Sequence, residues 1–222
     1  MYQRLWFSAP PTSPDCMVVG FIHGTVEIHY VSGEPIWHSY EVRPLYEFSP
    51  VCFPTYHDGD LYHLYEMELR VFKHLGENNI SSEVLIAEAP RSCCRSSAQY
   101  FLVKCDQHLL LLVMGGFGEP MEVFKLNDSR REWDKVNGVG KHMIYICDAT
   151  CICIEAKLPE MENKIYLAQS SSRNKKMVFY SLETSTYHTF DGKNIQENLA
   201  DVFVTAHLSA HAWIEPSWLK SP

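Results

Sequence analysis

The sequence predicts an all-β protein, a partial β-propeller of about four kelch-like, four-stranded antiparallel blades, and three observations predict it. One phrase that opens on a valine recurs about every 45 to 55 residues, starting at Val26, Val71, Val123 and Val178. Short runs of β-branched and aromatic residues alternate with turn residues about every eight to twelve positions. No segment sustains a helical apolar period over three turns. Repeats of this length, made of short strands, are typical of propeller blades.

We expect residues 1–222 to form a single incomplete propeller domain. The blades fall at about residues 4–48, 51–90, 98–138 and 142–192, and residues 200–222 form a closing segment. A propeller that lacks blades leaves strand edges unpaired, and such edges recruit other strands. The isolated chain is therefore expected to self-associate.

The first blade is interpreted as partial. Three of its strands are clear, namely Cys16–Ile22, Thr25–Tyr30 and Trp37–Val42, and only Arg4–Phe7 precedes them. The other three blades each show four runs that fit short strands. In the second blade these runs are Val51–Tyr56, Leu61–Tyr65, Leu69–His74 and Glu83–Ala87. In the third they are Tyr100–Cys105, Leu109–Met114, Met121–Leu126 and Glu132–Val136. In the fourth they are Thr150–Lys157, Lys164–Gln169, Met177–Leu182 and Tyr187–Phe190.

Aromatic residues recur at matching places in the repeats. In three repeats an aromatic residue follows the valine phrase by about ten positions, and two repeats share a tyrosine in a second phrase. Burying such a ring against a neighbouring blade is worth roughly 1.5–3 kcal/mol, so we interpret these residues as structural. The residues with this predicted role are Trp37, Tyr62, Trp133, Tyr166, Tyr187 and Trp213.

The charge balance argues against nucleic-acid binding. The formal net charge is −8, whereas binding to a phosphate backbone needs clustered Lys and Arg. The one basic cluster, Arg173-Asn174-Lys175-Lys176, fits a solvated hairpin tip. The apolar run Leu109–Met114 is about a third of a membrane span, so no membrane partner is expected.

The amino terminus shows no signal-peptide pattern, and this predicts a cytoplasmic or nuclear protein. In that setting the eight cysteines are expected to be reduced thiols. A zinc site formed by Cys147, Cys151 and Cys153 with His207 and His211 is a weaker hypothesis, because no Cys-x-x-Cys pair is present. Cys151 and Cys153 instead alternate with isoleucines, as core residues of a strand do.

No sequence pattern indicates a reaction. There is no Gly-x-Ser-x-Gly turn for a nucleophile and no Gly-x-x-x-x-Gly-Lys phosphate loop. We therefore expect no catalytic residue, no cofactor and no metal.

Several phrases resemble the plant F-box-associated β-propeller family, formerly catalogued as a domain of unknown function. They are Met121–Leu126, Glu132–Val136, Val139-Gly140, Asn163–Leu167 and Trp213–Trp218, in the order that the family shows. Lys141-His142-Met143 departs from the family, which usually has glycines there. Relatives begin with a helical F-box that docks on Skp1. No leucine-rich helical segment precedes Cys16 in this sequence, so we expect a truncated member that does not bind Skp1.

The resemblance implies a non-enzymatic protein-interaction module similar to the substrate-recognition propeller of ubiquitin-ligase F-box proteins. Its unknown target protein would contact two loops, Gly115–Pro120 with Gly116 and Phe117, and Ser170–Lys176 with Arg173 and Lys175. Two alternatives stay open: a propeller enzyme with a site in its channel, and a gene fragment with no function of its own.

Overall fold

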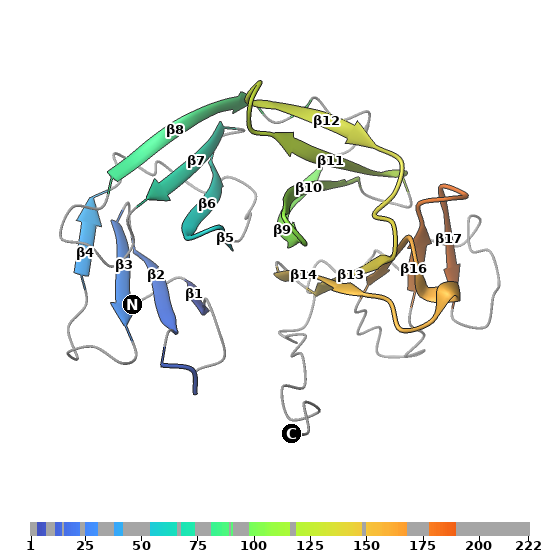
Figure 1. Ribbon diagram of the computed structural model, residues 1–222, viewed down its shortest axis with the longest axis horizontal. Coiled ribbons are helices and arrows are strands. Elements are labelled where there is room, and N and C mark those ends of the chain that lie inside the picture. Colours follow the sequence, from blue (N-terminus) through green and yellow to red (C-terminus); the bar gives the residue numbers. More distant parts are fainter. Residues whose placement is uncertain are drawn as a thin grey trace. The chain divides into compact units, whose positions relative to one another are not determined.

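The computed structural model describes residues 4–7, 12–14, 16–22, 25–30, 38–41, 54–65, 68–73, 81–88, 90, 98–115, 119–147, 150–167 and 178–189. Within these ranges the chain forms strands, one 3-10 turn at Pro159–Met161 (η1) and no α-helix (Figure 1). The all-β prediction is confirmed. Residue contacts divide the chain into two compact units, Met1–Ala89 with Asp128–Glu132, and Pro90–Asn127 with Trp133–Pro222.

The first unit contains two four-stranded antiparallel sheets. The strands of the first sheet are β1 (Arg4–Phe7), β2 (Met17–Ile22), β3 (Thr25–Tyr30) and β4 (His38–Glu41). The strands of the second are β5 (Thr55–His57), β6 (Asp60–Tyr65), β7 (Glu68–Lys73) and β8 (Ser81–Glu88). The amino-terminal strand β1 pairs with β2 from Arg4 opposite Phe21 to Phe7 opposite Val18, so the first sheet has its fourth strand.

Local chemistry explains the β5–β6 hairpin. Asp58 and Gly59 form a two-residue connection, and both have positive φ, at 50° and 88°. A hairpin turn of this kind suits the right-handed twist of strands, and Asp-Gly is among its favoured sequences. The strands that follow bury Leu61, Leu69 and Val71 completely, which anchors the second sheet.

His63 makes the stability of the first unit depend on pH. It lies opposite Arg70 in the β6–β7 ladder, and burial, with the charge of Arg70 adding to it, lowers the pKa of the imidazole from 6.5 to about 4. Between these values the unfolded chain binds a proton that the folded chain does not. The free energy of unfolding is therefore expected to fall by about 3 kcal/mol as the pH falls from about 6.5 to about 4.

Urea unfolding of the wild type and of His63→Gln at a series of pH values measures this contribution. The free energy of unfolding of the wild type should fall more steeply with falling pH than that of the variant, and only below about pH 6.5. Carboxylates titrate in both proteins, so the difference between the two curves isolates His63. Parallel curves would show that the His63 ring is solvated.

The third sheet, in the second unit, follows the sequence prediction closely. Its strands, in antiparallel order, are β9 (Gln99–Cys105), β10 (His108–Met114), β11 (Met121–Asn127) and β12 (Glu132–Val136). Every residue of β10 from Leu109 to Met114 is buried, so both faces of this strand are covered. This explains why its sequence is a continuous apolar run and does not alternate.

The fourth sheet differs from the prediction. It has five strands, in the order β14-β13-β15-β16-β17, and β13 pairs with β15 in parallel. Its strands are β13 (His142–Cys147), β14 (Thr150–Glu155), β15 (Lys164–Leu167), β16 (Val178–Ser181) and β17 (Thr186–Thr189). The expectation that Thr150–Lys157 lies next to Lys164–Gln169 was wrong, because β13 lies between them. Ile144 and Ile146 of β13 are buried at 0% and 2% exposure, and a central position provides that burial.

One hydrophobic core joins the third and fourth sheets. It draws Phe101, Val103 and Cys105 from β9, and Leu110, Leu112 and Met114 from β10. The fourth sheet supplies residues that share one face by register, including Ile144, Ile165, Tyr180 and Tyr187. Cys151 and Cys153 pack against the same core, which confirms that they share a face.

The recurring valine phrases occupy equivalent strands. They fall in β3, β7, β11 and β16, and each of these strands pairs with the last strand of its sheet. The repeat read from the sequence is thus a structural repeat.

Candidate functional site

Four of the six predicted aromatic residues lie in the described part of the chain. Tyr166 and Tyr187 are buried, with 3% and 1% of their surface exposed, whereas Tyr62 and Trp133 are half-buried. The predicted residues outside the described ranges are Trp37, Gly116, Phe117, Arg173, Lys175 and Trp213.

Tyr187 ties the fourth sheet to the loop that precedes β11. Its ring packs edge-on against Tyr180 at a centroid distance of 4.8 Å, and its hydroxyl donates to the Glu119 carbonyl at 2.8 Å. Glu119 stands just after the candidate loop residues Gly116 and Phe117. Tyr187 therefore holds one end of that loop.

Tyr166 belongs to a row of rings that crosses the other face of the fourth sheet. Tyr145, Tyr166, Phe179 and His188 lie opposite one another on successive strands, with neighbouring centroids 5.1, 5.6 and 5.3 Å apart. Burial raises the pKa of the Tyr166 hydroxyl above its usual value of 10.0, and Tyr145 and Glu160 add to the effect. These cross-strand pairs stabilise the sheet.

Tyr62 and Trp133 have more polar surroundings. Burial raises the pKa of Tyr62 to about 12, with the Asp60 carboxylate adding to the effect. The indole N–H of Trp133 is buried, and no acceptor among the described residues lies within hydrogen-bond distance of it. A buried N–H without an acceptor has a desolvation cost, and this cost reduces what the burial of Trp133 contributes to stability.

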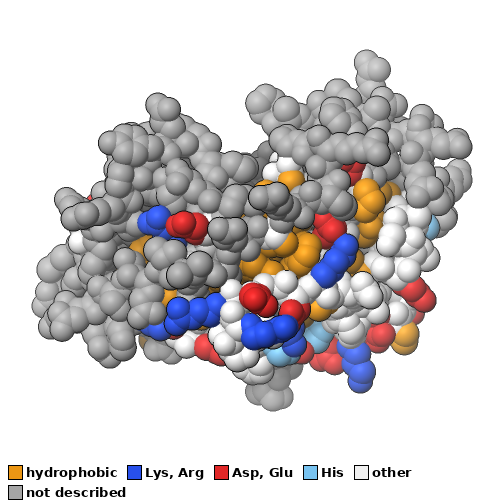
Figure 2. Space-filling view, turned by 90° about the horizontal axis from the view of Figure 1, so that it is seen from above, with side chains coloured by type: hydrophobic (Ala, Val, Ile, Leu, Met, Phe, Trp, Pro, Cys, Tyr) orange, Lys and Arg blue, Asp and Glu red, His pale blue; other side chains and the backbone are white. Residues whose placement is uncertain are grey.

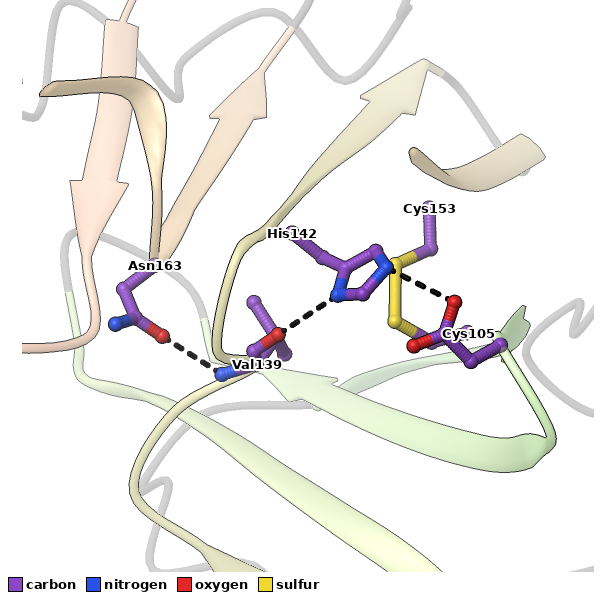
Figure 3. The surroundings of a disulfide bond; sticks show 6 residues. Cys105, Val139, His142, Cys153 and Asn163 are labelled. Atoms are coloured by element: carbon purple, nitrogen blue, oxygen red, sulfur yellow. Dashed lines mark hydrogen bonds and ion pairs between the residues drawn. A yellow bond between two sulfur atoms is a disulfide. The ribbon is translucent and has the colours of Figure 1, made fainter. Parts of the chain in front are cut away.

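The edges of the third and fourth sheets meet at a junction with several specific links (Figure 3). Cys105, at the end of β9, forms a disulfide with Cys153 of β14, and their Cα atoms are 5.3 Å apart. The expectation of reduced thiols is thus wrong for this pair. Beside the disulfide, His142 Nε2 lies 3.0 Å from Asp106 Oδ1. We call Cys105, Asp106, His142 and Cys153 the clasp.

The His142 ring lies between two acceptors. Its Nδ1 is 3.1 Å from the Val139 carbonyl oxygen, and its Nε2 faces the Asp106 carboxylate (Figure 3). A neutral imidazole donates through one nitrogen only, whereas the imidazolium donates through both. These two contacts fix the orientation of the His142 ring. Its side chain is 17% exposed, so the pair is partly shielded from solvent.

Asn163 connects three segments next to the clasp. Its backbone N–H donates to the His142 carbonyl at 2.9 Å, its carbonyl accepts from Leu182 N–H at 3.0 Å, and its Oδ1 accepts from Val139 N–H at 2.8 Å. Its φ is 55°, a conformation that Asn tolerates better than most residues. A Cβ at Gly138 would meet Asn163 Oδ1 at 2.7 Å, so glycine at 138 makes room for this side chain.

Replacing Asn163 tests this role. Asn163→Gly removes the bond to Val139 and keeps the backbone conformation at no steric cost, and we expect a loss of about 1–2 kcal/mol of unfolding free energy. Asn163→Ala also places a Cβ in the left-handed region, which adds about 1 kcal/mol. Thermal or urea unfolding should rank the alanine variant below the glycine variant.

Gly138→Ala provides the matched control. It should destabilise the wild type by displacing the Asn163 side chain, and destabilise Asn163→Gly much less, since the obstructing atom is gone. Additive effects of the two substitutions would contradict the contact between positions 138 and 163.

The described residues provide no other assembled reaction centre. Among them, no group of three His, Cys, Asp or Glu side chains is placed to hold a metal ion. Cys153 is bonded to Cys105, which removes it as a thiolate ligand for the zinc hypothesis. His207 and His211 lie outside the described residues.

The surface seen in Figure 2 is mixed in character. On that face the Lys and Arg side chains of the described residues lie interspersed with Asp and Glu, and apolar side chains are visible between them. Among the described residues, no helix has the length and apolar character that crossing a membrane requires.

Comparison with known proteins relates the chain to a family and to an F-box protein. The family model described as KIB1-4 beta-propeller matches residues 1–188. F-box protein At1g49360 of Arabidopsis thaliana is 27% identical over 172 residues, which is 72% of this chain and 33% of the relative. The chain thus spans about a third of the length of this curated relative.

Proposed function

Because the chain belongs to the KIB1-4 β-propeller family, we propose that it is a non-enzymatic protein-interaction module. The family match, which extends over residues 1–188, is the observation that carries the proposal. The similarity to an F-box protein supports a finer version, in which the module recognises a target for a ubiquitin ligase. The interspersed charges in Figure 2 fit a protein partner better than the continuous basic strip that a nucleic acid requires.

The two candidate loops have equivalent places in the structural repeat. One loop connects β10 to β11, where Met114 lies opposite Met121, and the other connects β15 to β16, where Leu167 lies opposite Val178. Each loop thus precedes a strand with the valine phrase, and paired residues hold its two ends together. Loops on a rigid sheet scaffold are the usual place for recognition residues. We propose that these two loops contact the target protein.

A pull-down with mass spectrometry tests the proposal. The full chain is used as bait beside Phe117→Ala and Arg173→Glu/Lys175→Glu. Lys141→Glu/Lys157→Glu is the matched charge reversal, at two exposed lysines of the second unit. We expect a reproducible partner that the wild type and the matched control recover and the loop variants lose. Partners retained by all variants would exclude the loops, and a bait without specific partners would contradict the proposed function.

Skp1 recruitment is a separate question. The resemblance assigns Skp1 docking to a helical F-box, so we propose that these 222 residues do not bind Skp1 by themselves. Direct recovery of purified Skp1 on the isolated chain would contradict this.

A further inference from the structure

The clasp joins two strand edges. β9 is the last strand on one side of the third sheet, and β14 is the last strand on one side of the fourth. Among the described strands β14 pairs with β13, and it also contacts β9. Its residues Cys151 to Ile154 are half-buried, in contrast to the buried centre of β13. The disulfide therefore adds a covalent link to the packing of β14 against β9.

Cys153 is the more exposed partner of the disulfide, and an exposed turn follows Cys105. Cys105 ends β9, and the turn residues that follow it, Asp106 to His108, are exposed. Cys105 is itself 6% exposed, and Cys153 is half-buried on its edge strand. A local opening of this hairpin end would bring a small thiol to the disulfide from the side of Cys153.

The second link of the clasp does not depend on the oxidation state of the sulfurs. Asp106 follows Cys105 directly in the chain, and it pairs with His142. In the β13–β14 ladder Cys153 lies opposite Ile144, two residues from His142. His142 and Cys153 therefore lie on the same face of the sheet. The ion pair thus connects the same two segments as the disulfide. When the disulfide is broken, this pair keeps the two thiols near each other, which raises their effective concentration.

We propose that the Cys105–Cys153 disulfide is a reversible thiol–disulfide exchange site for small cellular thiols. The oxidised clasp fixes β14 against β9. Reduction leaves the Asp106–His142 pair as the remaining specific link of the clasp and removes the covalent constraint between β9 and β14.

The chemistry balances with a thiol reductant alone. One reductant thiolate attacks one of the two protein sulfurs, forms a mixed disulfide and expels the other protein sulfur as a thiolate. A second reductant thiol then attacks the mixed disulfide and releases the second protein sulfur. Two electrons and two protons pass to the protein, and the reductant leaves as its own disulfide.

Differential alkylation with mass spectrometry of the full chain, purified without reductant, tests the site. We expect Cys105 and Cys153 to be joined, to separate in dithiothreitol under native conditions, and to rejoin when the reductant is removed. Buried Cys16 should resist alkylation throughout. Two free thiols in the protein purified without reductant would overturn the proposal. So would a disulfide that yields to dithiothreitol only after denaturant is added.

The rate of reoxidation tests the ion pair. Asp106→Ala and His142→Gln remove the same pair from opposite sides. Each should slow disulfide formation by about two- to fivefold, which corresponds to the usual strength of a partly exposed ion pair. Glu132→Ala, which removes an exposed pair with Arg130 at 3.9 Å on the β11–β12 turn, should leave the rate unchanged. Equal rates in all four proteins would show that the pair has no part in holding the thiols together.

Discussion

Tyr187→Ala is expected to lower the free energy of unfolding by about 3–5 kcal/mol, the usual cost of emptying a large buried aromatic site. The ring is 1% exposed and packs edge-on against Tyr180 inside the core shared by the third and fourth sheets. Removing it leaves a cavity lined by Tyr180 and its neighbours. Urea or thermal unfolding of the purified variant measures the loss.

Tyr187→Phe separates the ring from its hydroxyl. This variant keeps the packing and loses only the bond to the Glu119 carbonyl, so about 1 kcal/mol is expected. If both variants are equally stable, packing of the ring contributes nothing and the structural role predicted from the repeat is wrong. If Tyr187→Phe, which removes only the hydroxyl, weakens binding of a partner, the bond at Glu119 supports the β10–β11 loop.

Cys105→Ala/Cys153→Ala is expected to cost about 4 kcal/mol under oxidising conditions. The disulfide closes a loop with a sequence separation of 48 residues, and the chain-entropy relation gives this magnitude for such a loop. The constraint acts mainly on the unfolded chain, so the native structure should change little. Urea unfolding without reductant measures the effect.

Unfolding in dithiothreitol is the control for the cysteine variant. Once the wild type is reduced, both proteins lack the cross-link, and their free energies of unfolding should differ only by the packing of two sulfur atoms. A difference of the same size with and without reductant would mean that packing, and no covalent constraint, accounts for the loss.

Much of the fold could be predicted because individual strands and turns are visible in short stretches of the sequence. β9, β10, β11 and β12 begin and end within one residue of the runs read from the sequence, since β-branched or apolar runs and the turn residues between them are properties of neighbouring positions. β13 was missed although Met143 to Ile146 has strand character. Its parallel partner β15 lies beyond β14, and no local pattern records a pairing that passes over an intervening strand.

The clasp could not be predicted for a similar reason. Cys105 and Cys153 are 48 residues apart, and the sequence held eight cysteines without any sign of which pair would meet. Asn163 did leave a signal, because it opens the phrase Asn-Lys-Ile-Tyr-Leu that the family resemblance singled out. Its positive φ and its bond to Val139 explain why asparagine suits this position.

The central place of β13 also bears on how the second unit folds. Sheets made only of successive hairpins can grow strand by strand, but β15 joins β13 in parallel after the chain has passed through β14 and η1. The pairing of β13 with β15 is therefore less local than the pairings of β13 with β14 and of β15 with β16. Pairings between segments distant in the chain lose more loop entropy before they are stabilised, and they form more slowly. Until β15 pairs with β13, the apolar edge of β13 stays open to strands of other chains, so folding at high concentration favours misassembly at this edge.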